Sequence, residues 1–443
     1  MRMKLAAIGA MTLLLSGCSF LDSINPFSGD DKPKLQGQRQ SIIRFNDKLV
    51  ADPVLKGKPV VLPAMVTNTS WSMTGGVSGH APGNLALSSS LREVWRVKAG
   101  AGASSSLRYA GQPLVVGGRV YLLDAEGELA AFDGDNGKQI WRVRVAAKTG
   151  ASQTLSGGLA FGDGRIYATS GQTELFALDP ANGGAIWRKS LNAPARAAPT
   201  FADGRVFITT KDNELIALDA ATGRAVWNHV GTQESEGVYG QSSPAAEGNI
   251  VLSSYSSGEL YAFRVETGRT VWADNLSAVR RASAFWSLTD IAAAPVIDRN
   301  RAIAVSIGGR MVAIDVRSGA RAWQVEMGST STPYSVGDYV FAIDNDQELI
   351  CIDRESGGIK WISQLPRYED PEKREDPIMW VGPIVAGNRI IAANSIGDVA
   401  EISPADGSII RKLEAKAGVQ VIPVVANNTL YVLNDEGDLI AFR

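Results

Sequence analysis

The sequence predicts an all-β protein, an eight-bladed β-propeller built from four-stranded antiparallel blades. Three observations predict it: a motif that recurs every 38 to 51 residues from residue 91 onward, two hairpin signals in each copy, and incomplete units at both ends of the repeat region. The chain has 443 residues, of which 45% are hydrophobic and 20% charged, so it is long enough to bury such a core.

The repeated motif is an apolar strand, a tight turn and a second strand that ends in tryptophan. One copy reads Leu215-Ile216-Ala217-Leu218-Asp219, followed by Thr222-Gly223 and Trp227. An Asp side chain can accept hydrogen bonds from turn amides, and glycine adopts a positive φ readily. A second hairpin lies upstream, as in Pro199 to Phe207, so each unit supplies four strands.

Seven of the ten tryptophans occupy the same place in the repeat, which indicates packing between blades rather than a ligand platform. They are Trp95, Trp141, Trp187, Trp227, Trp272, Trp323 and Trp361. The copy from Val399 to Arg411 keeps Gly407 but has no tryptophan.

The two ends of the repeat region predict a closed ring. The last segment, Leu439 to Arg443, stops half-way through an eighth unit, whereas Leu91 to Trp95 reads as an isolated last strand. Pairing this N-terminal strand with the C-terminal blade closes the ring and removes an exposed sheet edge. We therefore expect one propeller over residues 91–443.

The first residues predict export and a lipid anchor. Arg2 and Lys4 precede an apolar run from Leu5 to Leu15, and this run is too short to span a bilayer. The following Leu15-Ser16-Gly17-Cys18 resembles a bacterial lipobox, in which the cysteine is lipidated and becomes the mature N-terminus. The alternative is an ordinary signal with an incidental Cys18. We expect a lipoprotein signal peptide at 1–17, a lipidated flexible tether at 18–40 and an irregular segment at 41–90.

Composition argues against several functional classes. With 44 basic and 46 acidic residues, the chain has no broad phosphate-binding surface, so nucleic acid is not an expected partner. Two cysteines and two histidines leave little material for a metal centre, a disulfide scaffold or a catalytic triad. Cys351 stands where other units have alanine, which favours a core position. The loop Asp133-Gly134-Asp135-Asn136-Gly137 departs from a calcium loop, and we predict a simple turn.

The pattern Ala-x-Asp-x-x-Thr-Gly-x-x-x-Trp resembles the repeat of propellers of the pyrroloquinoline-quinone (PQQ) type. That superfamily includes quinoprotein dehydrogenases and cofactor-free binding proteins. With its lipobox and single ring, the chain resembles the BamB family of outer-membrane protein assembly factors, lipoproteins of the barrel-assembly (BAM) machinery in Gram-negative bacteria. Ser19 after the cysteine suggests, by analogy with such lipoproteins, the outer membrane.

The resemblance implies a non-catalytic scaffold with no cofactor and no metal. Its expected partner is a BamA-like barrel protein, contacted through that protein's periplasmic POTRA domains. Unfolded outer-membrane proteins are the expected clients, and the N-terminal lipid is the expected contact with the membrane.

The resemblance also places the partner contact in connections between blades, at Glu236–Gln241 and at Ser287-Leu288-Thr289-Asp290. Val238 and Tyr239 depart from the family pattern of an aliphatic residue followed by Arg, and Ala292 stands at the family's second acidic position. Extended connections also hold Trp286 and Trp380, and Arg, Tyr and Trp are typical of interface hot spots. The expected contact residues are Glu236, Val238, Tyr239, Gln241, Arg280, Arg281, Trp286 and Asp290.

Alternatives remain open at the level of sequence. One alternative is that the expected contact residues pack inward and close the central channel. The whole chain would instead be a periplasmic PQQ-dependent quinoprotein or a ligand-binding propeller, although it has no adjacent cysteine pair. A third alternative is an envelope protein that binds peptidoglycan.

Overall fold

The computed structural model describes residues 49–104, 109, 111–145, 157–169, 172–234, 242–277 and 290–443, all within one compact unit. The signal peptide and tether predicted at 1–40, Cys18 included, lie outside these residues. The described part consists of strands, turns and irregular segments; it has no helix, and so none that could cross a membrane.

Eight four-stranded antiparallel sheets are present in the described part of the chain, together with a two-stranded hairpin, which confirms the predicted eight-bladed propeller. We number the blades in chain order. Blades 1 to 3 contain β2 (Leu114–Val116), β3 (Arg119–Leu123), β4 (Glu128–Asp133), β5 (Gln139–Arg144); β6 (Gly158–Gly162), β7 (Arg165–Thr169), β8 (Glu174–Leu178), β9 (Ala185–Ser190); β10 (Thr200–Ala202), β11 (Arg205–Thr209), β12 (Glu214–Asp219) and β13 (Ala225–Val230). Blades 4 to 6 contain β14 (Ala245–Glu247), β15 (Ile250–Ser254), β16 (Glu259–Arg264), β17 (Thr270–Asn275); β18 (Val296–Asp298), β19 (Arg301–Val305), β20 (Met311–Asp315), β21 (Arg321–Val325); β22 (Tyr334–Val336), β23 (Tyr339–Ile343), β24 (Glu348–Asp353) and β25 (Ile359–Gln364). Blades 7 and 8 contain β28 (Trp380–Ala386), β29 (Arg389–Asn394), β30 (Asp398–Ile402), β31 (Ile409–Glu414); β32 (Val424–Ala426), β33 (Thr429–Leu433), β34 (Asp438–Phe442) and β1 (Glu93–Lys98), and the separate hairpin is β26 (Tyr368–Asp370) with β27 (Glu375–Pro377).

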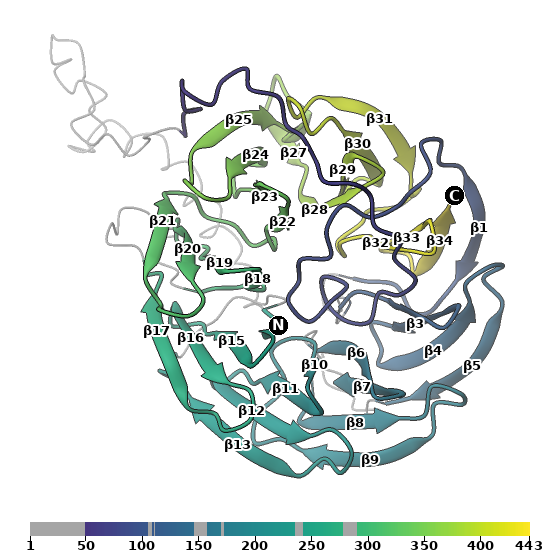
Figure 1. Cartoon of the computed structure of the whole chain (residues 1–443). Coiled ribbons are helices and arrows are strands. Elements are labelled where there is room, and N and C mark those ends of the chain that lie inside the picture. Colours follow the sequence, from purple (N-terminus) through teal and green to yellow (C-terminus); the bar gives the residue numbers. More distant parts are fainter. Residues whose placement is uncertain are drawn as a thin grey trace, which may run out of the picture. The chain divides into compact units, whose positions relative to one another are not determined.

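The blades stand around a central axis, with each blade's first strand innermost and its last strand at the rim (Figure 1). Because neighbouring strands are antiparallel, the disc has two distinct faces. The connections between blades and the turns between second and third strands lie on one face, which we call the inter-blade face. The first turn of every blade and the third turn of blades 1 to 7 lie on the other face, which we call the plug face for the segment described below.

The ring closes as predicted, by pairing of the first and last strands. β1 pairs antiparallel with β34, which completes the sheet β1-β34-β33-β32. Beyond the strand ends, Arg92 and Arg443 exchange backbone hydrogen bonds of 2.9 and 3.0 Å. Blade 8 therefore has no free outer edge where the chain ends.

The seven repeated tryptophans bind each blade to the next. In every case the indole Nε1 donates a hydrogen bond of 2.7–3.3 Å to a backbone carbonyl in the third turn of the following blade. The turn glycine is needed for this contact. A Cβ on Gly268, whose φ is +68°, would lie 2.5 Å from an atom of the Trp227 ring. The interpretation as inter-blade packing is confirmed.

The junction between blades 7 and 8 is built differently, because blade 8 has no third turn to receive an indole. Arg411 stands in place of tryptophan on β31 and forms an ion pair of 2.7 Å with buried Glu401. Arg389, from the neighbouring strand β29, donates to the carbonyls of Ser88 and Ser89 at 2.6 and 3.0 Å. The missing tryptophan thus coincides with the missing turn.

Two smaller sequence interpretations concern Asp133 and Cys351. The Asp133 carboxylate accepts hydrogen bonds from the amides of Asp135 and Asn136, as expected of a turn. Among the described residues, no group of three potential ligands could hold a metal ion. Cys351 is fully buried on β24, and this burial raises the pKa of its thiol.

Residues 66–87, which we call the plug, fill the central channel from the plug face. Their backbone bonds to the inner strands of blades 1, 2, 4, 5 and 7 and to the first turn of blade 8, and Trp71 is completely buried. The hydrogen-bonded pairs are Trp71 with Val115, Ser72 with Phe161, Ser78 with Ala246, Gly79 with Ile297, Leu85 with Val385 and Asn68 with Asn427. The irregular segment predicted at 41–90 therefore includes a structural part of the propeller.

Candidate partner-binding face and central cavity

The predicted contact segments fall, in sequence, between the last strand of one blade and the first strand of the next. Glu236–Gln241 lies between β13 and β14, and residues 280–290 lie between β17 and β18. Glu236, Val238, Tyr239, Gln241, Arg280, Arg281 and Trp286 fall outside the described residues. Asp290 is the predicted contact residue that the structure describes.

Asp290 lies at the start of blade 5, where it is only 2% exposed. Its carboxylate forms an ion pair with the equally buried Arg196, which precedes the inner strand of blade 3. The same guanidinium donates to the Ile291 carbonyl at 3.2 Å. The pair links the connections into blades 3 and 5. Asp290 therefore holds its loop in place, and its part in a partner contact stays a prediction.

The connection between blades 6 and 7 projects the hairpin β26–β27 on the same face. Trp380, at its end, is 3% exposed, and its Nε1 donates to the Pro366 carbonyl at 2.8 Å. The backbone N–H of Trp380 also donates to the Gln347 side chain at 2.8 Å. This tryptophan anchors the connection, so it is not available as an exposed hot spot. Its neighbour Met379 is 53% exposed.

Carboxylates surround the inter-blade face, because an acidic residue begins the third strand in seven blades. These residues are Glu128, Glu174, Glu214, Glu259, Glu348, Asp398 and Asp438. Cations on outer strands neutralise some of them, as in the pairs Arg144–Glu128 at 2.9 Å and Lys412–Asp398 at 2.8 Å. Nearby, burial and the neighbouring carboxylates of Glu348 and Asp346 together raise the pKa of Asp344 to about 7. Such mixed charge suits a polar protein partner.

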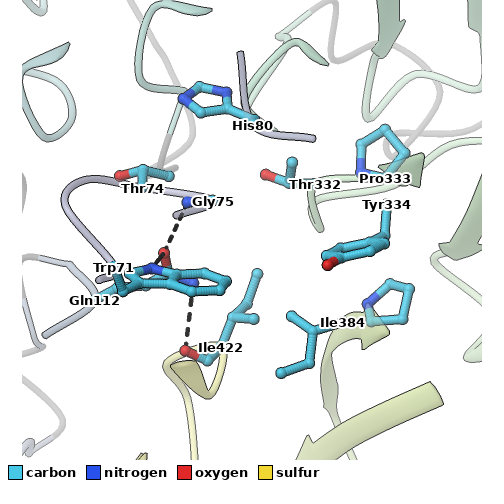
Figure 2. Close-up of a pocket in the computed structure, with 11 residues that line it drawn as sticks. Trp71, Thr74, Gly75, His80, Gln112, Thr332, Pro333, Tyr334, Ile384 and Ile422 are labelled. Carbon is cyan, nitrogen blue, oxygen red and sulfur yellow. Dashed lines mark hydrogen bonds between the residues drawn. The ribbon is translucent and has the colours of Figure 1, made fainter. Parts of the chain in front are cut away.

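A small cavity lies beside the plug at the central axis, with Trp71 and Gln112 on one side and Tyr334 on the other (Figure 2). Its volume of about 20 Å³ holds roughly one water molecule. The Gln112 Oε1 atom accepts hydrogen bonds from Trp71 Nε1 at 3.2 Å and from the Gly75 amide at 3.0 Å. These contacts fix the plug against blade 1.

His80, also at this cavity, is fully buried and adopts a φ of +63°. Its Nδ1 lies 2.7 Å from the Pro295 carbonyl oxygen and therefore carries the proton that it donates. Burial lowers the pKa of His80 to about 4, so the ring is neutral at pH 7. Neutral His80 thus holds the plug against blade 5 through its hydrogen bond to Pro295. The cavity beside it is too small for a tricyclic quinone.

The prediction that each outer strand ends in tryptophan is wrong, because these strands continue past it. The repeated blades, with a tryptophan at the third position of seven outer strands, define a propeller of the PQQ-repeat class. A family model described as outer membrane protein assembly factor BamB matches residues 44–155 and 126–363, and the chain belongs to this family.

The curated relatives that match this chain carry the same family name. The chain is 28% identical over 205 residues to the outer membrane protein assembly factor BamB of Alkalilimnicola ehrlichii, covering 46% of this chain and 51% of the relative. It is 25% identical over 199 residues to the protein of that name from Escherichia coli, covering 45% and 48%. The matched region thus spans about half the length of these relatives.

Solved structures show the same fold. The crystal structure of BamB from Moraxella catarrhalis matches with a TM-score of 0.67 at 20% identity, covering 80% of this chain and 100% of that one. A europium-containing methanol dehydrogenase matches with a TM-score of 0.67 at 14% identity, covering 84% and 98%. At these identities the matches establish the propeller fold and nothing about activity.

Sequence reasoning did not identify the residues that organise the central axis. Trp71 and His80 lie in a single-copy segment, and Gln112 occupies a position whose residue type changes from unit to unit, so no repeat marks them. Arg196 gave no signal either, because its partner Asp290 is 94 residues away in sequence. The burial of Trp380 could have been predicted from one feature, because this residue begins the inner strand of blade 7.

Proposed function

We propose that this chain is a non-catalytic scaffold of the barrel-assembly machinery at the outer membrane. The observation that carries the proposal is the family match over residues 44–363 in a chain that forms a complete eight-bladed ring. In this role the disc binds the periplasmic POTRA domains of a BamA-like barrel protein. It thereby assists the folding and insertion of outer-membrane β-barrel proteins, which are its proposed clients.

A lipid anchor at Cys18 accounts for the location. Removal of residues 1–17 at the lipobox leaves Cys18 as the acylated N-terminus, which holds the propeller on the periplasmic side of the outer membrane. Each buried methylene of an acyl chain contributes about 0.8 kcal/mol, so several chains give a stable anchor. Mass measurement of the mature N-terminal peptide tests this directly.

The inter-blade face is the proposed contact with the barrel protein. Its connections differ in length and composition from blade to blade, whereas the plug covers the centre of the other face. The proposed contact residues are Glu236, Val238, Tyr239, Gln241, Arg280, Arg281 and Trp286, with Asp290 holding its connection through Arg196. Aromatic and Arg side chains at such places supply most of an interface's binding energy.

Photo-crosslinking from single positions tests this assignment in intact cells. A photoreactive residue in place of Tyr239 or Trp286 is expected to capture the barrel protein. The same residue in place of Val77, which is 42% exposed on the plug, is expected not to capture it. Crosslinks to the barrel protein from position 77 alone would contradict the assignment.

A quinoprotein activity is the second candidate, because dehydrogenases share this fold. The plug occupies the central axis, and the cavity beside it has room for about one water molecule. A quinone added to the protein is therefore expected to leave its absorbance unchanged and to support no dye-linked alcohol oxidation. A saturable absorbance change accompanied by alcohol oxidation would favour the enzyme.

A further inference from the structure

An apolar and basic strip crosses the plug face between the rim of blade 6 and the central axis. We define the hub-face strip as Val54, Lys56, Lys58, Val61, Met65 and Val66, all of which are exposed. The aliphatic members are 72% (Val54), 69% (Val61), 48% (Met65) and 47% (Val66) exposed. In Figure 1 this part of the chain is the purple segment that runs in front of the disc toward its centre.

The strip is held in one position by contacts on its other side. Val60 and Leu62 pack against the core of the propeller, while the alternate residue Val61 points away. The Val61 amide donates to the Tyr339 hydroxyl at 3.3 Å, and Asn84 Nδ2 donates to the Pro63 carbonyl at 2.8 Å. The outward side chains therefore cannot turn inward, and the apolar surface that they leave in water is available to a second surface.

The charged side chains of the strip itself are both lysines, and Asp52 lies next to its rim end. From Pro53 to Leu91 the sequence contains no Asp or Glu, and its two lysines, Lys56 and Lys58, both belong to the strip. Basic side chains among exposed aliphatic ones are the composition of segments that lie at the interface of an anionic bilayer. Each lysine near such a surface contributes about 1 kcal/mol.

The position of the strip in the sequence brings it near a bilayer, provided that Cys18 is lipidated as proposed above. The thirty residues from Ser19 to Lys48 separate that cysteine from the described chain. Fully extended, they reach about 100 Å, which sets the largest distance between the domain and the membrane. A surface held at high effective concentration needs only weak contacts to stay bound.

We propose that the hub-face strip rests on the anionic phospholipid surface to which the chain is anchored, with its aliphatic side chains in the headgroup region. This contact turns the plug face of the disc toward the membrane and leaves the inter-blade face open to the periplasm. It rests on the proposed lipid anchor, but not on binding to a barrel protein.

The test uses the lipidated protein in vesicles of phosphatidylethanolamine and phosphatidylglycerol that contain brominated lipids. A fluorophore is attached to a cysteine introduced as Val61→Cys or, as the matched control, as Met379→Cys on the inter-blade face. Cys351 is buried and does not react. We expect a blue shift and bromine quenching at position 61 and neither at position 379.

Equal quenching at both positions, or none at position 61, would overturn the proposal. Quenching of a label at position 61 by an acceptor on a second copy of the chain would also overturn it, since the strip would then be a protein interface. Replacing Lys56 and Lys58 by Gln should weaken the interaction by about fivefold per lysine. The mass of the N-terminal peptide shows whether lipidation, rather than the strip, has failed.

Discussion

The two faces of the disc are built by different parts of the sequence. The plug face combines repeated turns, which receive the tryptophans, with the single-copy plug that bonds to inner strands around the axis. The inter-blade face consists of connections whose lengths differ between blades. The comparison teaches that the plug face belongs to the folded core, so its central residues stabilise the propeller. Apart from anchoring residues such as Arg196, Asp290 and Trp380, the connections lie outside the repeated core, which favours them as contact elements.

The largest effect is expected at the centre of the plug. Trp71→Ala removes a fully buried indole and its hydrogen bond to Gln112, and should lower the free energy of unfolding by about 3–5 kcal/mol. Val77→Ala, at an exposed position of the same segment, is the control and should change it by about 0.5 kcal/mol or less. Urea denaturation measures both. Equal effects would show that the plug is not part of the core.

The next effect concerns the buried pair of the inter-blade face. Arg196→Met removes the guanidinium that forms an ion pair with the buried Asp290 carboxylate, and should destabilise the protein by about 3 kcal/mol or more. Replacing both residues, Arg196→Met with Asp290→Leu, should cost less than the single change. An unaltered denaturation midpoint in the single variant would contradict the structural role of this pair.

A pH titration should show the contribution of His80. The pKa of about 4 in the folded protein lies below the ordinary 6.5, so the unfolded chain binds the proton more tightly. Stability is therefore complete above pH 6.5 and is lost as the pH falls toward 4, by up to about 3 kcal/mol. Unfolding free energies of the protein and of His80→Gln, compared across this range, isolate the effect. Parallel curves would exclude it.

The smallest effect is expected at the exposed end of the projecting hairpin. Met379→Ala removes a side chain that is 53% exposed and should change the free energy of unfolding by less than about 0.5 kcal/mol. Its buried neighbour provides the contrast, since Trp380→Ala should cost several times more. Thermal denaturation of the two variants measures the difference, and a large loss in Met379→Ala would show that this connection is fixed by the fold.

The sequence was sufficient to predict whatever the chain repeats. Asp219, Gly223 and Trp227 recur with their spacing because every blade needs the same turn and the same contact with its neighbour. The closing strand was also predictable, since Leu91 to Trp95 matches the last strand of a unit and the C-terminal unit lacks one. Local geometry, repeated many times, explains this success.

The remaining features depend on contacts between single-copy residues that are distant in sequence. Nothing local to Trp71 indicates that it pairs with Val115 and enters the channel. The replacement of tryptophan by Arg411 is explained by its ion pair with Glu401 and by the absence of a third turn in blade 8, and neither is evident from the local sequence. The predicted contact residues came from family resemblance, and apart from Asp290 they lie outside the described residues. Their roles stay predictions.

Purification of the lipidated chain from envelope extracts, followed by mass spectrometry of what it retains, tests the proposed scaffold role most directly. We expect a barrel protein with POTRA domains among the bound proteins. We also expect loss of that protein in the double variant Tyr239→Ala, Trp286→Ala and its retention in Val77→Ala. Equal recovery from both variants, or absence of any barrel protein from the unaltered chain, would contradict the account.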